Sequence, residues 1–338
     1  MIRGVRHMLR LVRAARVLAA HDALMPPDQR ARLPWAARMG LRLAGLGVSR
    51  RRGEANPLAA ALTALGPSYI KLGQFLATRS DLVGAARAEA LSALQDRLQP
   101  FGLAPALAEI RKELGADADS LFSDISAPVA AASIAQVHRG LTPKGKAVAI
   151  KVLRPGIEAR FAADLESFAF AAELMERFVP ALRRLRPVDA VATLAQSVKL
   201  EMDLRMEAAA MSEMAANSVN DPDFRVPRVD WQRTARRVLT SEWIDGIALN
   251  DPARLAAAGI DLARLGDIVI QSFLRHAVRD GFFHADMHPG NLFADAQGRL
   301  VAVDYGIMGR LSVKARRFLA EILYGFIKRD YRRVSDVH

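Results

Sequence analysis

The most informative part of this 338-residue chain is His284-Ala285-Asp286-Met287-His288-Pro289-Gly290-Asn291, followed by Asp304-Tyr305-Gly306. It places a carboxylate, an amide five residues later, and a second carboxylate thirteen residues after the amide. This order suits a phosphoryl-transfer site, in which one carboxylate orients the nucleophile while the amide and second carboxylate hold Mg²⁺ on nucleotide phosphates. The pattern therefore predicts that Asp286 is catalytic and that Asn291 and Asp304 bind metal.

A lysine upstream strengthens this interpretation. Lys151 lies in Ala147-Val148-Ala149-Ile150-Lys151-Val152-Leu153, an apolar and β-branched run with one charge, which is typical of a buried strand. A lysine there is costly to bury unless it meets an anion, and ATP phosphates with a helix glutamate would supply one. The alternative is a strand-edge lysine whose amine reaches water. The acid–amide–acid series downstream favours the nucleotide interpretation.

Composition restricts the classes of function. The chain has no cysteine, which excludes disulfides and thiolate metal sites, and its net charge is +12. Nucleic acid or an anionic membrane surface would suit this charge, but aromatic residues are only 6% and no groove-reading motif is present, so nucleic acid is disfavoured. No secretory signal or bilayer-spanning apolar run is recognised. The absence of cysteine agrees with a reducing compartment.

The first eighteen residues predict a basic amphipathic helix. Arginines recur at helical spacing on one side, and apolar residues occupy the opposing arc. The arginines are Arg3, Arg6, Arg10 and Arg13, and the apolar residues are Ile2, Val5, Met8, Leu9 and Val12. This pattern is typical of an element on a membrane surface, and equally of a helix docked on the protein's own surface.

The pattern along the chain divides it into four parts. We expect a basic helical extension at residues 1–56 and a helical accessory region at 57–124. A nucleotide-binding lobe with inserted helices follows at 125–247, and a second lobe at 248–338. The 32 residues after Gly306 are too few for a complete second lobe of a kinase, so the chain is expected to be truncated there.

Periodicity predicts the elements within these parts. Residues 157–217 and about 261–280 are patterned as helices, the former with breaks near Pro180 and Pro187. Strands are predicted at 133–138, 147–153, 226–229, 237–244 and 300–303, with a turn at 142–146.

Four motifs together identify a resemblance. They are Lys71-Leu72-Gly73-Gln74, Ala130-Ala131-Ala132-Ser133, Glu201-Met202-Asp203 and the run from Asp286 to Asn291. They match the KxGQ signature, the alanine-rich substitute for a kinase glycine loop, the ExD signature and the catalytic loop of the UbiB/ADCK family of atypical protein-kinase-like proteins. The chain resembles this family over about residues 57–338.

The resemblance implies an α+β, two-lobed protein-kinase-like fold with an N-terminal helical KxGQ accessory region. It implies ATP and Mg²⁺ binding, ATPase activity and a role in ubiquinone biosynthesis at a membrane. It also implies a cytoplasmic protein that is peripherally associated with the inner membrane. The implied partners are isoprenoid quinone-precursor lipids, the biosynthetic proteins and an anionic membrane surface. The alanine tract and accessory motifs would contact the nucleotide, and Glu242-Trp243-Ile244 would form the interlobe hinge.

The acidic residues need partners. Glu201 and Asp203 would point apart if both lay in one helix, so we expect different partners for them. Lys71 and Gln74 lie one helical turn apart and share a face. We predict that Glu201 faces Lys71, and that Glu207 pairs with Lys151. The 56 positions between Lys151 and Glu207 exceed a typical kinase spacing and require extra helix over 157–195.

Two other functions fit parts of the pattern. His284, Asp286 and His288 have the composition of a nonhaem iron site, which would suit a hydroxylase of a polyprenylphenol precursor. That hypothesis leaves Asn291 and Lys151 unexplained. An ATP-binding pseudokinase scaffold would retain every nucleotide-site residue without turnover. Tyr305 in the Asp-Tyr-Gly motif keeps an aromatic ring and adds a hydroxyl that needs a partner.

Overall fold

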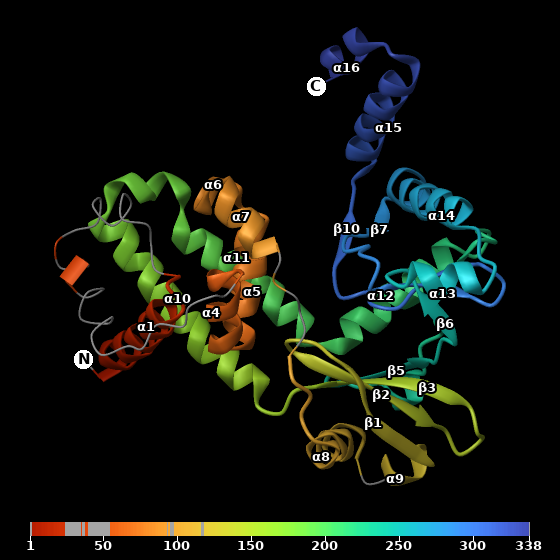
Figure 1. Cartoon of the computed structure of the whole chain (residues 1–338), viewed down its shortest axis with the longest axis horizontal. Coiled ribbons are helices and arrows are strands. Elements are labelled where there is room, and N and C mark those ends of the chain that lie inside the picture. The colour runs from red at the N-terminus through yellow and green to blue at the C-terminus, as the bar shows by residue number, and fades with distance from the viewer. Residues whose placement is uncertain are drawn as a thin grey trace. The chain divides into compact units, whose positions relative to one another are not determined.

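The computed structural model describes residues 2–23, 35, 38–39, 55–92, 94, 98–115 and 118–337 (Figure 1). The chain forms two compact units, which are described separately. The helical unit comprises Met1–Ala106, Pro128–Val137 and Leu153–Met202, and the mixed unit comprises Leu107–Ala127, His138–Val152 and Asp203–His338. The sequence Ser49-Arg50-Arg51-Arg52-Gly53-Glu54 predicts a polar break after the N-terminal helical extension, and it lies outside the described residues.

The helical unit is built on helices whose ends follow from sequence. In chain order these are α1 (Ile2–Ala20), α4 (Pro57–Leu65), α5 (Pro67–Ala77), α6 (Ser80–Val83), α7 (Ala85–Ser92), α10 (Ile157–Phe178), a 3₁₀ helix η1 (Pro180–Leu185) and α11 (Pro187–Glu201). Prolines begin α4, α5, η1 and α11, where the missing N–H costs no hydrogen bond. The breaks predicted at Pro180 and Pro187 are therefore confirmed.

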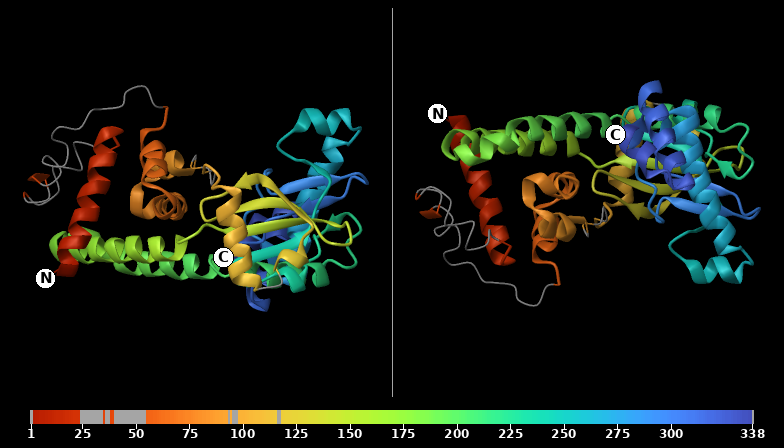
Figure 2. Two further views of the ribbon diagram at one scale, coloured as in Figure 1. Left: turned by 90° about the horizontal axis from the view of Figure 1, so that it is seen from below. Right: turned by 90° about the horizontal axis from the view of Figure 1, so that it is seen from above.

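Long helices pack along one another in this unit. The α10 and α11 helices form a pair that is connected by η1 (Figure 2), and α1 packs against α10 and α4. The side chain of Tyr69 on α5 meets the edge of the Phe168 ring on α10, with ring centroids 5.0 Å apart. Gly73 lies against Leu62 and Leu94, where an added Cβ would come within 2.7 Å and 2.3 Å of their methyl carbons.

The mixed unit contains most of the strands. A four-stranded sheet has the order β1-β2-β3-β5, formed by β1 (Asp124–Ala131), β2 (Ala135–Leu141), β3 (Ala147–Leu153) and β5 (Val238–Glu242). The turn predicted at 142–146 joins β2 to β3, with Gly145 at φ 74°. The helices α8 (Leu103–Leu114) and α9 (Ala118–Leu121) contribute Ile110 and Ala118 to a core with Val148, Ile150 and Val152.

The remaining elements carry the catalytic motifs. They are α12 (Leu204–Asn217), β4 (Phe224–Arg225), η2 (Trp231–Arg233), β6 (Gly246–Ala248), α13 (Pro252–Ala257), α14 (Leu262–Leu274), a π-helix η3 (Arg275–Asp280), β7 (Phe282–His284), β8 (Leu292–Asp295), β9 (Leu300–Ala302), β10 (Met308–Arg310), α15 (Val313–Lys328) and α16 (Tyr331–Val337). The strands form a sheet of order β4-β9-β8-β6 and a β7–β10 pair.

Three predicted boundaries differ from the structure. The strand predicted at 226–229 is reduced to a single antiparallel bridge between Val229 and Ser241, and Pro227 has no N–H to donate to a ladder. The helix predicted over 261–280 changes to a π-helix at Arg275. The helical pattern over 157–217 is also interrupted after Glu201, because α11 ends at Glu201 and Asp203 caps α12.

Candidate active site

Lys151 is the centre of a compact ionic cluster. It lies in β3 opposite Leu239 of β5, and its side chain is 16% exposed. Its Nζ donates to both carboxylate oxygens of Glu207 at 2.9 Å, and to Oδ2 of Asp304 at 3.3 Å. The structure therefore brings together three residues that the sequence separates by up to 153 positions, and the predicted Lys151–Glu207 pair is formed.

Glu207 is held in place by the start of α12. The Asp203 carboxylate accepts the Arg205 N–H at 3.2 Å and caps the helix, which sets Glu207 in its first turn. The Glu207 side chain is only 6% exposed. Its Oε1 also accepts the backbone N–H of Tyr305 at 3.4 Å. Glu207 thus links the lysine strand to the Asp304-Tyr305-Gly306 motif.

The electrostatics follow from burial and pairing. Burial raises the pKa of Glu207 to about 7, although the Lys151 ammonium opposes this change. Burial also raises the pKa of Asp304, but Lys151 and the Gly306 N–H outweigh it and hold the value at about 2. For Lys151, burial lowers the pKa, while the Asp304 and Glu207 carboxylates raise it above its ordinary value. At neutral pH the site therefore holds a charged amine and an ionised Asp304.

The catalytic loop follows β7 and is shaped by its own hydrogen bonds. Buried His284 accepts the Asp286 N–H on Nδ1 at 3.1 Å, and burial lowers the pKa of its imidazole, which favours the neutral ring. The Asn291 amide donates to the Asp286 carbonyl at 3.3 Å. The backbone carbonyl of Asn291 accepts the N–H of Val303, the residue before Asp304, at 3.0 Å. The loop and the second acid are therefore joined through backbone and amide contacts.

The metal-binding assignment fits the donors present. Asp304 is an ionised carboxylate whose side chain is 41% exposed, and its Oδ1 accepts the Gly306 N–H at 3.0 Å. Asn291 uses its amide N–H for the Asp286 carbonyl, which leaves the side-chain carbonyl for another partner. Oxygen donors of this kind are the ligands that Mg²⁺ prefers. Asn291 and Asp304 thus suit the ion chemically.

The iron-site alternative finds no support in the loop. Both His284 and His288 use Nδ1 to accept backbone N–H groups, from Asp286 and Gly290 respectively. Among the residues that the structure describes, no three His, Asp or Glu side chains are grouped to hold a metal ion. The two histidines shape the turn.

Tyr305 corrects one expectation. Its side chain is 1% exposed and packs against His284 with ring centroids 5.4 Å apart. The predicted hydrogen-bond partner for its hydroxyl is not found within the described part of the chain. Burial therefore raises the pKa of Tyr305, and the ring acts as a packing element beneath the motif.

The alanine tract is a turn at the end of β1. Ala130 and Ala131 end the strand, and the Ala132 N–H donates to the Ala135 carbonyl at 2.8 Å. Ser133 is fully buried. Arg154 donates to the Ala132 carbonyl from Nε and Nη2 at 3.1 and 2.9 Å. The turn is therefore fastened from the chain that follows β3.

The accessory motifs form pairs of their own within the helical unit and at the start of α12. Lys71 Nζ lies 2.8 Å from Glu201 Oε2, and these side chains are 12% and 13% exposed. Gln74 is half-buried one turn further along α5. Asp203 instead binds the Arg205 guanidinium at 2.6 Å. The prediction of different partners for Glu201 and Asp203 is confirmed.

The hinge candidate ends β5. The Trp243 N–H donates to the Ala147 carbonyl at 3.3 Å, which continues the pairing with β3. The Glu242 carboxylate accepts Arg225 Nη2 at 2.7 Å, so its side chain is committed to a structural ion pair. The Trp243 indole donates to Asp245 at 2.9 Å, while Ile244 is partly exposed. The Glu242 N–H also donates to the Arg228 carbonyl at 2.8 Å, so the backbone N–H groups of Glu242 and Trp243 are both paired within the protein.

A buried acid that the sequence analysis missed supports the catalytic loop. Asp221, whose side chain is 2% exposed, binds Arg275 Nη1 at 3.0 Å and Arg279 through two contacts of 2.9 and 3.0 Å. The His276 Nε2 atom lies 3.3 Å from it. Arg279 also donates to the carbonyl of Asn217, the last residue of α12. The run Arg275-His276-Ala277-Val278-Arg279 on an otherwise apolar helix was the signal for it.

A second missed contact joins α12 to β10. Arg310 donates to both carboxylate oxygens of Glu213 at 2.8 and 2.5 Å, and its guanidinium lies 4.4 Å from the centroid of the Phe282 ring. Since β10 pairs with β7, this contact ties the helix of Glu207 to the strand that precedes the catalytic loop. No sequence pattern predicts this contact, because the two exposed residues lie 97 positions apart.

Comparisons with known proteins agree with this geometry. Residues 93–338 match the family described as the ABC1 atypical kinase-like domain. A protein of Marinobacter nauticus named "Probable protein kinase UbiB" is 42% identical over 283 residues, which cover 82% of this chain and 52% of that protein. One of the same name from Azotobacter vinelandii is 40% identical over 315 residues, covering 90% and 59%.

A solved structure shares the fold. The complex of Rv3197 with erythromycin from Mycobacterium tuberculosis superposes with a TM-score of 0.55 at 27% identity, and the match covers 84% of this chain and 71% of that chain. The present chain spans about half the length of the curated relatives it matches. Because the family match extends over most of its residues, the chain belongs to the family of the ABC1 atypical kinase-like domain and has a kinase-like α+β fold.

Proposed function

We propose that this protein binds Mg²⁺-ATP and cleaves its γ-phosphate as a kinase-type ATPase. The observation that carries the proposal is the convergence of the Lys151 amine on Glu207 and Asp304. An amine fixed by a buried glutamate beside a metal-binding acid is the arrangement that phosphoryl transfer uses to hold a triphosphate. The family membership supports the same reaction class.

Each residue then has a defined task. Lys151 binds the α- and β-phosphates and is oriented by Glu207. Asn291 and Asp304 would hold Mg²⁺, which when bound neutralises charge on the phosphate oxygens. Asp286 orients the attacking hydroxyl or water, because a carboxylate in this position accepts a proton as the nucleophile attacks. The turn fixed by His284 and Asn291 sets the position of Asp286.

The other motifs would select and enclose the nucleotide. Backbone groups of Glu242, Trp243 and Ile244 would contact the adenine. The tract Ala130-Ala131-Ala132-Ser133 would cover the phosphates, and its methyl groups restrict φ compared with a glycine loop. Lys71, Gln74, Glu201 and Asp203 would restrict access to the nucleotide. The Lys71–Glu201 pair supports a fixed accessory helix, because both side chains are largely buried.

The proposed setting is ubiquinone biosynthesis at a membrane surface. Its support is the name of the relatives and the net charge of +12, which suits an anionic partner. The acceptor of the phosphoryl group would be water, an isoprenoid quinone precursor or a biosynthetic protein. In the described part of the chain, no helix is both long and apolar enough to cross a bilayer.

A thermal-shift assay tests ligand binding directly. With Mg²⁺-ATP at about 100 times its Kd, binding stabilises the folded state by about 2.7 kcal/mol, a rise in Tm on the order of 5 °C. The shift should require Mg²⁺ and should be lost in Lys151→Met. Adding quinone-precursor lipids or phenol mimics tests the second ligand in the same experiment. An unchanged Tm with every nucleotide would contradict the proposal, while a shift without phosphate release would identify an ATP-binding scaffold.

A further inference from the structure

Helix α1 is fastened to α10 through one face, which carries His7, Arg10 and Ala14. His7 Nδ1 lies 3.2 Å from the Ser167 hydroxyl of α10, and Arg10 donates to the Ala163 carbonyl at 2.6 Å. Ala14 on the same side is buried. This contact accounts for one of the two interpretations of the N-terminal sequence, a helix docked on its own protein.

The opposite face of α1 carries an aliphatic stripe in the open. Val5, Met8, Leu9 and Val12 are 57, 46, 65 and 41% exposed. Their spacing of i, i+3, i+4 and i+7 places them within an arc of about 100° on a helix. The docked face needs none of them, so the stripe is available to a second surface.

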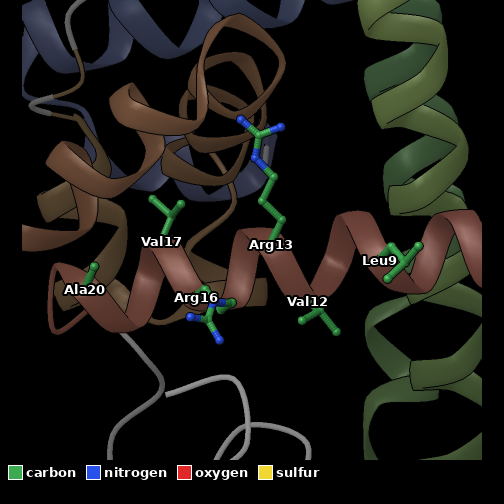
Figure 3. A pocket seen from close by; sticks show the side chains of 6 residues that line it. All are labelled: Leu9, Val12, Arg13, Arg16, Val17 and Ala20. Atoms are coloured by element: carbon green, nitrogen blue, oxygen red, sulfur yellow. The ribbon is translucent and has the colours of Figure 1, made fainter. Parts of the chain in front are cut away.

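Arginines border this stripe. Arg6, Arg13 and Arg16 are exposed, and α1 contains five arginines with no acidic residue. Figure 3 shows Val12 and Arg16 projecting to one side of the helix and Arg13 to the other, and these three residues line a pocket together with Leu9, Val17 and Ala20. Arginine stems can lie along apolar surface while their heads remain in a polar layer. The surface thus joins an aliphatic stripe to arginines along one edge, Arg6 and Arg13, and to Arg16 one turn beyond its end.

We propose that α1 is an interfacial docking helix that lays its aliphatic stripe on an anionic lipid bilayer. The docked face keeps the helix on α10, the stripe enters the boundary between headgroups and acyl chains, and Arg6, Arg13 and Arg16 contact lipid phosphates. Charge complementarity selects the bilayer over a second copy, because two such arginine-bordered stripes repel each other. The inference rests on the proposed function only in taking a membrane as the partner surface. Vesicle binding itself can be measured without any ATP turnover.

The length of the stripe sets its strength. The stripe runs along the helix axis from Val5 to Val12, a rise of about 10 Å, so only two helical turns enter the interface. Such a short element gives weak, reversible binding that depends on the arginines, each contributing about a fivefold change in affinity for anionic lipid. Binding should therefore fall with added salt.

The experiment is flotation of the full chain with vesicles of neutral phosphatidylcholine, and with vesicles that also contain phosphatidylglycerol. Met8→Ser/Leu9→Ser should lower partitioning by about tenfold or more, since two exposed side chains lose their insertion. Arg6→Gln/Arg16→Gln should remove most of the preference for phosphatidylglycerol while leaving weak binding.

Matched variants change the same residue types elsewhere. Val219→Ser/Ile270→Ser removes two side chains that are 77 and 60% exposed, and Arg254→Gln/Arg264→Gln removes two exposed arginines. Both should bind vesicles as the wild type does. Equal losses in these controls would overturn the assignment to α1.

Two further outcomes would also overturn it. One is wild-type protein that ignores both vesicle types. The other is self-association in sedimentation equilibrium that Met8→Ser/Leu9→Ser abolishes, which would make a second copy the occupant. The thermal shift with Mg²⁺-ATP, measured on each variant, reports folding and nucleotide binding separately. A normal shift without vesicle binding contradicts the docking helix alone, and vesicle binding without a shift contradicts the proposed function alone.

Discussion

Replacing Asp304 with asparagine should abolish turnover while leaving the fold nearly intact. The carboxylate meets Lys151 through one contact of 3.3 Å and is 41% exposed. A pKa lowered from 3.8 to about 2 corresponds to about 2.4 kcal/mol of stability before solvent screening. Because exposed ion pairs are strongly screened, we expect Asp304→Asn to cost only about 1 kcal/mol of unfolding free energy.

Glu207→Gln is the matched comparison, because it removes the other partner of the same amine. The Glu207 carboxylate is 6% exposed and makes two contacts of 2.9 Å. Above pH 7, where Glu207 is ionised, breaking this buried pair leaves Lys151 with Asp304 as its charged partner, at a cost of about 3 kcal/mol. Stability should therefore separate the two variants, with Glu207→Gln the less stable. Asp267→Asn, at an exposed position on α14, should match the wild type.

The assays are urea unfolding and phosphate release at varied Mg²⁺. Asp304→Asn should lower kcat by about 100-fold or more, equivalent to about 2.7 kcal/mol of transition-state stabilisation. Retained turnover in this variant would refute the metal assignment. A loss of stability as large as that of Glu207→Gln would refute the reasoning from exposure.

The remaining predictions concern pH and the accessory helices. Because the folded-state pKa of Asp304 is depressed, its contribution to stability is present above about pH 4 and is lost as pH falls through about 2, so Asp304→Asn should flatten this part of an acid-unfolding curve. Lys71→Met should lower the free energy of unfolding by about 3 kcal/mol, because it leaves Glu201 charged and buried. The double variant Lys71→Met/Glu201→Leu should recover most of this stability. Equal urea midpoints for the single and double variants would contradict a buried ion pair. Gly73→Ala should destabilise by about 1–2 kcal/mol despite alanine's helix propensity, because its Cβ meets Leu94 at 2.3 Å, and a higher Tm would show that the leucine moves aside freely.

Much of the catalytic centre could be predicted because its motifs are local. The spacing of Asp286, Asn291 and Asp304 lies within one loop and its following strands, and the apolar run around Lys151 specifies a strand by itself. The partner glutamate was harder, since 56 positions separate Lys151 from Glu207. The sequence predicts the Lys151–Glu207 pair because Lys71 is the candidate partner of Glu201, which leaves Glu207 for Lys151. Both ion pairs are present in the structure. The roles of these residues in turnover stay predictions.

What the sequence could not predict depends on tertiary contacts. The strand expected at 226–229 has β-branched residues, but Pro227 limits its pairing to one bridge at Val229, and the regular ladder is formed by Phe224 and Arg225. The π-helix at Arg275 follows from a change in hydrogen-bond register that periodicity does not reveal. The Tyr305 hydroxyl was expected to find a partner, yet packing of its ring determines its position.

The buried Asp221 cluster has a consequence for how the protein opens. Although burial raises the pKa of Asp221, Arg279 and Arg275 hold it below its usual value, so the carboxylate stays charged and bound to both guanidinium groups. Arg279 extends this contact to the end of α12, and η3 leads into β7. Amide protons in α12 and in η3 should therefore exchange with solvent deuterium through one shared opening event, with similar protection and a common response to urea.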